Sequence, residues 1–462
     1  MTKYSTIINH NIEKCKPTKI DYHKLEKIKR KSLEILQQTI DEKNYAVEII
    51  PGGSYPKDTW VKNDVDLDIF LKFDRNTSRS NFEKQVIDIG MTSFESYNPY
   101  LRYSEHPYVE TYVNKIRINV VGCFDIKQGE KVLSNADRSI FHTEFINSRL
   151  TNKQKDNVRL LKLFLKTFGL YGSEIKTKGF SGYVCELLIL KNGSFLDVLK
   201  NVVKNTNIDD KYVVCVEKSH EAYSVIHDYP IVILDPVDPK RNLGSAISLE
   251  NYFKFLFVAN AFLKNPSNKF FSKRRKHIKN NQLIMNNIVI LKFSHDKRSS
   301  DILWGQLLRS IIKLENKLKK HGFNVIKRSA VTNENDSSSF IFLLEDLEIS
   351  SLEIRKGPFV NMFLQSSNFI QKNRDSMLKW INEEGKIIMV KTKNMSNIKD
   401  YLVHVMSMEF NTLGLSSGFS DISKNYEIIY GKKIISYSKK HKWLGEGISE
   451  FIQDESIFDI CK

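Results

Sequence analysis

The fold is decided by residues 65–73, which read VDLDIFLKF and follow the turn-rich sequence GGSYPKDTW of residues 52–60. Side chains alternate between apolar and polar along 65–73, which is typical of a strand with one buried face. Asp66 and Asp68 therefore project from the same face, about 7 Å apart at Cα for a rise of roughly 3.3 Å per residue. Two carboxylates on one face indicate a site for a divalent cation such as Mg²⁺, which prefers hard oxygen ligands.

The turn before this strand suits a phosphate. Gly53 and Ser54 follow a short apolar strand expected at 46–50, and glycine lets the backbone N–H groups and the serine hydroxyl approach a phosphate closely. A Gly-Ser turn followed about a dozen residues later by Asp-x-Asp is typical of nucleotidyl transfer. The alternative is that Asp66 and Asp68 simply face solvent on an edge strand.

Charge indicates the class of partner. The 462-residue chain carries 71 Lys and Arg against 54 Asp and Glu, a formal net charge of +17 that is spread along its length. A polyanion is the expected partner, and nucleic acid fits better than a membrane surface because no strongly amphipathic basic helix stands out. A solvated lysine-rich surface is the alternative. Hydrophobic residues make up 41%, which excludes a disordered chain, and the length predicts about two to four domains.

The sequence pattern shows no disulfide framework, membrane span or signal peptide. Cysteines occur singly at Cys15, Cys123, Cys185, Cys215 and Cys461 without metal-ligand spacing, which argues against a zinc site and a disulfide framework. No apolar run approaches the roughly 18 residues of a membrane span, and the N-terminus has no apolar signal core. We therefore expect a cytoplasmic protein without a membrane partner.

Periodicity predicts the order of the elements. The first 145 residues form a mixed α/β domain, with helices at 22–42 and 81–95, the second capped by Ser80, and with strands at 46–50, 65–73, 108–113 and 116–124. Helices follow at 152–168, ended by Gly169, and at 181–191 and 247–262. The basic run at 273–277 marks a boundary, beyond which strands at 288–293 and 340–344 flank a helix at 304–320.

The helix at 152–168 has a basic face. Arg159, Lys162 and Lys166 are spaced so that three cations share one side of the helix, and a triphosphate would be attracted to that side. An ordinary solvated face is the alternative.

A set of sequence blocks resembles the archaeal-type (class I) CCA-adding enzymes, the tRNA nucleotidyltransferases. The blocks occur in the family's order between about residues 50 and 250 and read GSYPKDTW at 53–60, DLD at 66–68, EHPYV at 105–109, ADR at 136–138, VRLLK at 158–162, LYG at 170–172, GFSGYVCELL at 179–188 and DPVDPKRN at 235–242. The resemblance implies an α+β multidomain fold: a polymerase-β-like nucleotidyltransferase palm at 1–145, a mainly helical nucleotide-binding domain at 146–270, and a smaller α/β tRNA-binding tail region at 271–462.

The resemblance also implies a function. Such an enzyme adds C, C and A to the tRNA 3′ end from CTP and ATP without a template, using Mg²⁺, and a homodimer is the state that the resemblance suggests. The implied nucleotide-binding residues are Ser54 and Lys57 at the phosphates, His142, Lys162 and Tyr171 around the pocket, and Arg241 at the base. Position 57 is usually arginine, so Lys57 keeps the charge and loses the bidentate fork.

Asn119 departs from the family pattern, which places a third metal-binding carboxylate at this position. An asparagine offers one neutral oxygen and cannot accept the proton of an attacking hydroxyl. Two alternatives to CCA addition follow: a tRNA acceptor-end binding protein that has lost catalysis, or a nucleotidyltransferase that adds a different set of nucleotides.

A two-residue hairpin loop at Asn114-Lys115 suggests how the missing charge is replaced. With this loop, Val113 pairs with Ile116 and Glu110 lies directly opposite Asn119, with Cβ atoms about 5 Å apart. We hypothesise that Glu110 supplies the missing carboxylate. A slip of one residue would turn Glu110 to the other face.

Overall fold

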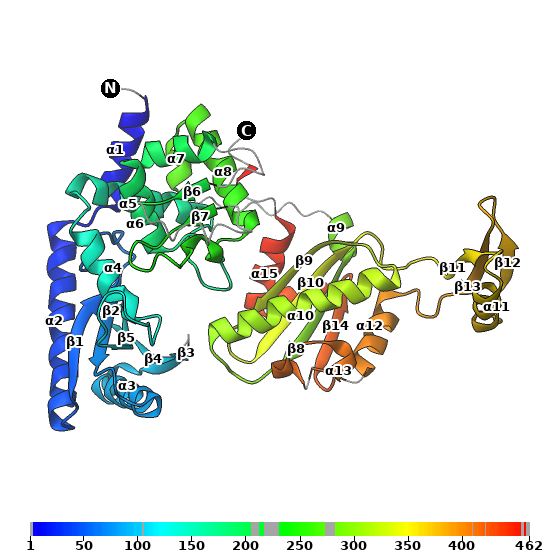
Figure 1. Cartoon of the computed structure of the whole chain (residues 1–462), viewed down its shortest axis with the longest axis horizontal. Helices are drawn as coiled ribbons and strands as arrows, with labels where there is room; N and C mark the ends of the chain where they lie inside the picture. The colour runs from blue at the N-terminus through cyan, green and yellow to red at the C-terminus, as the bar shows by residue number, and fades with distance from the viewer. Residues whose placement is uncertain are drawn as a thin grey trace. The chain divides into compact units, whose positions relative to one another are not determined.

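The computed structural model describes residues 3–103, 106–204, 212–216, 231–272, 282–408, 410–420, 422–453 and 457–458 (Figure 1). The chain divides into two compact units, one of Met1–Lys276 with Ser299–Asp301 and Asp454–Lys462, the other of His277–Arg298 and Ile302–Gln453. The basic run predicted to mark a boundary at 273–277 lies outside the described residues. Within those residues, no helix is both long and apolar enough to cross a membrane.

The first unit begins with a five-stranded mixed sheet. Its order is β1 (Val47–Gly52), β2 (Asp66–Phe73), β5 (Ile116–Phe124), β4 (Pro107–Val113) and β3 (Tyr100–Tyr103), with β2 and β5 parallel and the other neighbours antiparallel. Helices α2 (Lys19–Glu42) and α3 (Arg79–Ser93) pack their apolar residues into the same core as the sheet. The alternation at 65–73 is confirmed, because Leu67, Ile69, Leu71 and Phe73 are buried in this core.

Two boundaries differ from the sequence prediction. β1 runs on through Pro51, which a strand tolerates at the edge of a sheet because no ladder donor is needed there. The cap of α3 is Ser78 rather than Ser80, since the Ser78 side chain accepts from the backbone N–H of Asn81. Helix α1 (Lys3–Cys15), ahead of the predicted first helix, was not predicted.

The β4–β5 hairpin has the predicted two-residue loop. Asn114 and Lys115 both adopt positive φ, 49° and 69°, as a tight hairpin turn requires, and Val113 pairs with Ile116. The turn lacks the favoured glycine because asparagine tolerates this conformation and the strands on either side fix the register.

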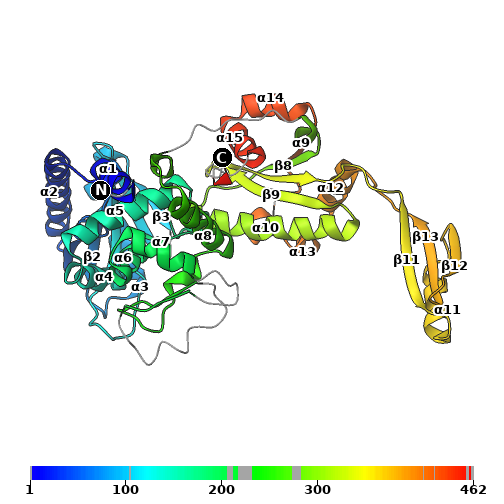
Figure 2. The ribbon, with the colours of Figure 1, turned by 90° about the horizontal axis from the view of Figure 1, so that it is seen from above.

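The rest of the first unit is mainly helical. It contains α4 (Asp137–Asn147), α5 (Asn152–Thr167), α6 (Gly182–Asn192), α7 (Phe195–Lys204) and α8 (Leu249–Lys264), with the short parallel pair β6 (Tyr212–Val214) and β7 (Ile231–Ile233). Thr151 and Gln154 form a capping box at the start of α5, and Gly169, at φ 68°, follows its end as predicted. Figure 2 shows these helices gathered around α5 and α6.

The second unit contains two sheets. A four-stranded antiparallel sheet has the order β14 (Tyr426–Tyr430), β8 (Ile288–Ser294), β10 (Ser337–Leu344) and β9 (Val325–Thr332). A separate sheet has the order β11 (Leu352–Phe359), β13 (Lys386–Thr392) and β12 (Leu378–Ile381). The helices are α9 (Gln282–Asn286), α10 (Ser300–His321), α11 (Phe363–Lys372), α12 (Ile398–Ser407), α13 (Phe410–Leu413), α14 (Lys433–Lys440) and α15 (Lys442–Ile452).

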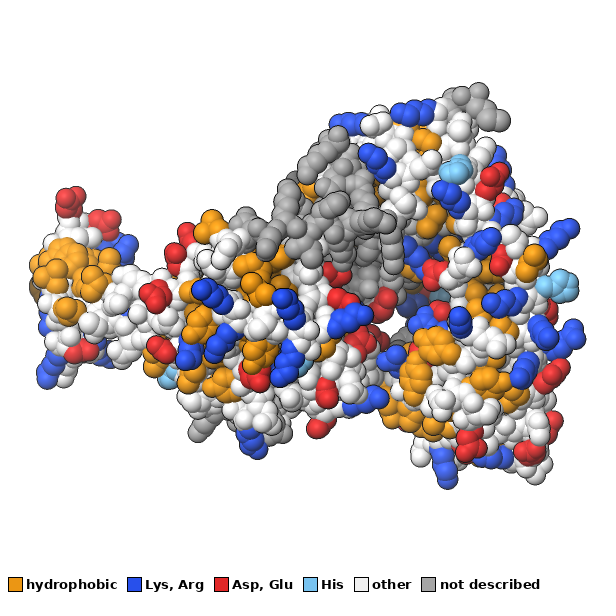
Figure 3. All heavy atoms as spheres, turned by 180° about the vertical axis from the view of Figure 1, so that it is seen from behind, with side chains coloured by type: hydrophobic (Ala, Val, Ile, Leu, Met, Phe, Trp, Pro, Cys, Tyr) orange, Lys and Arg blue, Asp and Glu red, His pale blue; other side chains and the backbone are white. Residues whose placement is uncertain are grey.

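Surface character differs between the parts. Figure 3 shows Lys and Arg side chains distributed over the visible face of the first unit, in keeping with the dispersed charge of the sequence. Around the three-stranded sheet, large hydrophobic side chains are exposed instead, among them Ile354, Phe363, Leu364 and Trp380 (Figure 3).

Candidate active site

A row of side chains crosses all five strands of the first sheet. Gly52 pairs with Asp68, Asp68 with Asn119, Asn119 with Glu110, and Glu110 with Tyr100. Directly paired residues project from the same face, so the row places Asp68, Asn119 and Glu110 side by side. The predicted register of Glu110 opposite Asn119 is confirmed.

The three polar side chains of this row, those of Asp68, Asn119 and Glu110, differ in their hydrogen bonding. Asn119 Nδ2 donates to Asp68 Oδ1 at 2.8 Å, whereas the buried Asn119 Oδ1 has no hydrogen-bond partner among the described residues. The buried Glu110 carboxylate accepts from the Tyr100 hydroxyl and lies 3.6 Å from Arg102. Glu110 therefore has its contacts on the β3 side of the row and not on the Asn119 side.

Charge also gathers beside the row. Asp66 forms an ion pair with Arg117, its partner in the β2–β5 register. Burial, and to a smaller extent the neighbouring Asp66 charge, raise the pKa of Asp68, while the hydrogen bond from Asn119 opposes that rise. Asp68 is thus an ionisable group held in a poorly solvated place, where a bound cation would lower its pKa again.

The donor atoms of this row suit a hard divalent cation. Within the described part of the chain, no group of three His, Cys, Asp or Glu side chains is placed to hold a metal. The site instead combines the carboxylates of Asp66 and Asp68 with the orphaned amide oxygen of Asn119. All three are oxygen donors, and an unpartnered buried oxygen beside a carboxylate fits a metal ligand.

The Gly53-Ser54 turn lies against Asp68. Gly53 has a φ of 71°, and a Cβ atom at this position would lie 2.0 Å from Asp68 Oδ2. Only glycine therefore lets the turn approach the carboxylate this closely. Ser54, the next residue, is half-buried, and its backbone oxygen accepts from Thr59 N at 3.1 Å, which closes the turn.

Two predicted phosphate-binding lysines share one buried carboxylate. Lys57 Nζ lies 2.6 Å from Glu186 Oε2, and Lys162 Nζ lies 3.6 Å from Glu186 Oε1. The Thr59 hydroxyl bonds to Glu186 at 2.5 Å and accepts from Lys162 at 3.2 Å. Burial opposes ionisation of Glu186, but the charges of Lys57 and Lys162 outweigh it and lower its pKa, whereas burial lowers the pKa of Lys162.

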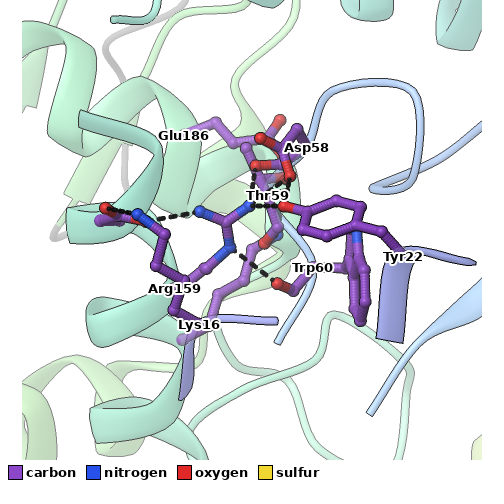
Figure 4. Close-up of polar contacts among 9 residues, drawn as sticks. Lys16, Tyr22, Asp58, Thr59, Trp60, Arg159 and Glu186 are labelled. Carbon is purple, nitrogen blue, oxygen red and sulfur yellow. Dashed lines mark hydrogen bonds and ion pairs between the residues drawn. The ribbon is translucent and has the colours of Figure 1, made fainter. Parts of the chain in front are cut away.

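The basic face predicted for α5 does not face solvent. Arg159 is buried, and its guanidinium donates to Trp60 O at 3.0 Å, to Asp58 O at 2.6 Å and to Asp156 Oδ1 at 2.6 Å (Figure 4). Lys166 pairs with Asp64. Arg159 therefore offers its charge neither to a triphosphate nor to solvent, because segment 58–64 packs on this side of α5 and binds the guanidinium.

Tyr171 lies close to Lys162 at the start of α6. A Cβ atom at Gly182 would be 3.0 Å from the Tyr171 hydroxyl and 3.5 Å from Lys162 Nζ, so both side chains meet over this glycine. Burial raises the pKa of Tyr171 and keeps its phenol protonated. The predicted neighbours Lys57, Lys162 and Tyr171 are thus brought together.

His142 and Arg241 meet at Asp235. His142 Nε2 lies 2.9 Å and Arg241 Nη1 lies 3.4 Å from the same oxygen, Asp235 Oδ2. The His142 ring stacks on Tyr183 at a centroid distance of 3.9 Å. Arg241 also lines a cavity of about 380 Å³ that includes Ser181 at the N-terminus of α6.

The charge of Lys57 influences both Asp68 and His142. Burial has the largest influence on the pKa of both Asp68 and His142, and the Lys57 charge acts on each of them as well. Lys57 Nζ lies 5.5 Å from the centroid of the Tyr183 ring, which stacks on His142, so Lys57 is close to the His142 side of the site.

Three family profiles match successive parts of the chain. They describe a nucleotidyltransferase domain at 29–144, a tRNA nucleotidyltransferase second domain at 156–272, and a CCA-adding enzyme C-terminal domain at 285–431. The CCA-adding enzyme of Saccharolobus islandicus is 34% identical over 380 residues, which cover 82% of this chain and 86% of that relative. The chain belongs to the CCA-adding enzyme family.

A second relative agrees with membership of the CCA-adding enzyme family. The CCA-adding enzyme of Sulfolobus acidocaldarius is 33% identical over 416 residues, covering 90% of this chain and 94% of the relative. Among solved structures, the Cid1 poly(U) polymerase bound to MgATP aligns over 59% of this chain and 99% of its own, with 13% identity and a TM-score of 0.48. The family assignment rests on the sequence relatives. Nucleotidyltransferases of this family use a divalent metal ion, which the oxygen donors described above fit.

Sequence reasoning missed two buried carboxylates of this CCA-adding family member. Glu186 lies in the quoted block at 179–188 and Asp235 begins the block at 235–242, but neither had a predicted role. A signal was present for Glu186, since it is the one acidic residue in the apolar run YVCELLIL, and a buried carboxylate requires a partner. The identity of those partners depends on contacts across more than a hundred residues.

Gly53→Ala tests the close approach of the turn to Asp68. The added methyl displaces the carboxylate, and we expect nucleotide addition to fall about 10²-fold, as a misplacement of about 1 Å at a reacting centre does. The matched control is Gly193→Ala, because Gly193 also has positive φ, 90°, but a Cβ there meets nothing within 4 Å. Equal rates for both variants in a primer-extension assay would show that the contact is unimportant.

Proposed function

We propose that this protein adds C, C and A to the 3′ end of tRNA from CTP and ATP, without a template, in the cytoplasm. The observation that carries the proposal is the row containing Asp68 and Asn119 next to the Gly53-Ser54 turn, in a chain of the CCA-adding enzyme family. We assign catalysis to residues 1–145, nucleotide binding to residues 146–270 and tRNA binding to residues 271–462. We also propose that the protein assembles as a homodimer.

The proposed roles of the residues follow their positions. Ser54 and Lys57 bind the phosphates of the incoming nucleotide, and the ion pair with Glu186 holds the Lys57 ammonium in place. Lys162 and Tyr171 close the pocket over Gly182. Arg241 lies at the base, beside the cavity that it lines, and His142, bonded to the same oxygen of Asp235, completes the pocket.

Asp66, Asp68 and Asn119 would hold Mg²⁺. When bound, the ion lowers the pKa of the attacking 3′ hydroxyl and neutralises charge on the phosphates. Asp66 would share its ion pair with Arg117, and Asn119 would contribute its amide oxygen. Asn119 cannot take the proton of the hydroxyl, so a carboxylate must do so.

Incubation with tRNA that lacks its last three nucleotides tests the proposal. With labelled CTP and ATP and added Mg²⁺, we expect incorporation of two C residues and one A, and we expect EDTA to abolish it. Incorporation of a single nucleotide would favour an enzyme with a different nucleotide set. Tight tRNA binding without incorporation would favour an acceptor-end binding protein. The specific argument for this alternative is that position 119 carries an asparagine instead of a carboxylate.

We further propose that Glu110 supplies the carboxylate missing at Asn119. Its register opposite Asn119 and its burial support this role. We expect Glu110→Gln to lower the rate of nucleotide addition about 10²-fold, the usual contribution of a general acid or base. We expect Asn119→Asp in the Glu110→Gln background to restore the rate, because the carboxylate returns to the neighbouring position. Single-turnover rates check both variants.

An unchanged rate in Glu110→Gln combined with a large gain in Asn119→Asp alone would contradict the role of Glu110. The thermal unfolding midpoint of Glu110→Gln shows whether a lower rate reflects the lost carboxylate or a loss of folded protein. Tyr100→Phe is the control, because it removes the hydrogen bond from the Tyr100 hydroxyl to Glu110 but leaves the Glu110 carboxylate in the site.

A further inference from the structure

The sheet face that carries Asp66 and Asp68 continues over β5 and β4 to the edge strand β3 (Figure 1). Residues that pair across strands, and residues two apart on one strand, project from the same face. Tyr112 pairs with Arg117, and Arg117 pairs in turn with Asp66. This face therefore also carries an aromatic patch of three tyrosines and two arginines, namely Tyr100, Arg102, Tyr108, Tyr112 and Arg117.

The rings and cations of the aromatic patch lie close to one another. The guanidinium carbon of Arg102 lies 5.1 Å from the centroid of the Tyr100 ring. Burial and the contact with Glu110 chiefly raise the pKa of Tyr100, and Tyr112 is near enough to contribute to that rise. The patch thus begins at the row of Asp68, Asn119 and Glu110 and extends away from Asp68 toward β3.

Tyr112 is the most exposed ring of the patch. It is 50% exposed, whereas Tyr100 and Tyr108 are half-buried. The side chain of its strand partner Arg117 is 41% exposed. Tyr112 lies two strands from Asp66, which is about 10 Å at Cα for the usual spacing of strands. An open aromatic ring with a cation beside it therefore lies within the reach of one nucleotide from the metal-binding carboxylates.

This combination of groups suits single-stranded RNA. Unpaired bases stack on tyrosine rings while arginines attract the phosphates, and common RNA-binding modules use aromatic side chains on a sheet in this way. The position of the patch indicates which nucleotide it would take. The 3′ hydroxyl that reacts must lie at the metal beside Asp66 and Asp68, so the base on the same ribose is the one within reach of Tyr112.

We propose that Tyr112 is a substrate-binding residue on which the 3′-terminal base of the RNA stacks before each addition. The inference rests on the proposed function and names the residue that holds the end of the tRNA. Stacking tolerates any sequence because every base has a π-face. One ring can therefore hold the tRNA in all three rounds, although the terminal nucleotide changes from one round to the next.

The affinities of two RNAs for Tyr112→Ala and for the unchanged protein test the stack. One RNA is tRNA without its last three nucleotides, and the other is the same RNA without a base on its terminal ribose. We expect the unchanged protein to bind the first RNA about 10-fold more tightly, as one stacked base usually allows. We expect Tyr112→Ala to bind both RNAs equally, because the terminal base then has no ring to stack on. Filter binding without nucleotides, at one salt concentration, gives the four affinities.

Tyr112→Phe and Tyr103→Ala are the matched controls. Phenylalanine keeps the ring, so the 10-fold difference between the two RNAs should remain. Tyr103 is 44% exposed and follows Arg102 on β3, so it projects from the opposite face of the sheet, and its loss should also leave the difference unchanged. A purely structural role of Tyr112 would weaken the binding of both RNAs together and lower the urea unfolding midpoint, and would preserve the difference.

A difference between the two RNAs that persists in Tyr112→Ala would overturn the inference. If the unchanged protein adds C, C and A but binds both RNAs equally, the proposed function holds and the inference is wrong. If the protein adds no nucleotide but shows the difference that depends on Tyr112, the terminal base is bound as inferred and the catalytic part of the proposed function is wrong. Failure to bind either RNA would overturn both.

Discussion

Asp68→Asn should lower the rate of nucleotide addition about 10³-fold while the protein stays folded. The change removes one of two carboxylates on the strand that would hold the metal, and it places two amides, at 68 and 119, against each other. Metal-dependent single-turnover addition to trimmed tRNA measures the effect. Asp74→Asn is the matched control, because Asp74 follows the end of the same strand and is exposed.

The stability of Asp68→Asn should move in the opposite direction to its activity. The pKa of Asp68 is raised in the folded protein, chiefly by burial, so the stability linked to its protonated form is present at low pH and lost as pH rises through that pKa. At neutral pH the ionised Asp68 carboxylate lowers the free energy of unfolding, and the neutral amide of asparagine removes this cost. We therefore expect an equal or higher unfolding midpoint in urea. A variant that is both inactive and less stable would indicate a structural role instead.

Arg159→Met should lower the free energy of unfolding by about 3–5 kcal/mol, the cost of breaking a buried ion pair by removing one partner. The guanidinium joins α5 to segment 58–60 through Asp58 and Trp60 and also binds Asp156 (Figure 4). Without it, the carboxylates of Asp58 and Asp156 and the backbone oxygens of Asp58 and Trp60 lose a donor. Urea unfolding followed by circular dichroism measures the change.

Two comparisons sharpen this result. Arg159→Lys keeps the charge but not the planar fork, so it should recover only part of the stability. Lys153→Met, on an exposed position of the same helix, should have little effect. If Arg159→Met unfolds at the same urea concentration as Lys153→Met, the contacts of Arg159 contribute nothing to stability.

The sequence predicted those parts of the site that depend on local geometry. Alternation placed Asp66 and Asp68 on one face of a strand, and counting back from a two-residue turn placed Glu110 opposite Asn119. Both arguments hold because a strand has a period of two and a tight turn leaves one register. The family resemblance added the helical residues, which no local rule brings together.

Contacts between distant segments were beyond sequence reasoning. Periodicity showed that Arg159 lies on the polar side of α5, but the same pattern fits water or another segment of chain as its neighbour. The covering segment 58–64 is about a hundred residues away. Asp235 is similarly linked to His142, 93 positions earlier, and only the folded chain reveals that both His142 and Arg241 depend on it.

The length of the β4–β5 hairpin loop limits which mutations a gene for this protein can accept, because it determines the face of β4 on which Glu110 lies. An in-frame insertion of one codon beside Asn114 would shift β4 by one place against β5 and turn Glu110 away from the face that holds Asn119. Surface loops commonly tolerate such insertions, whereas this tip should accept residues that adopt positive φ, such as glycine, and changes of length hardly at all.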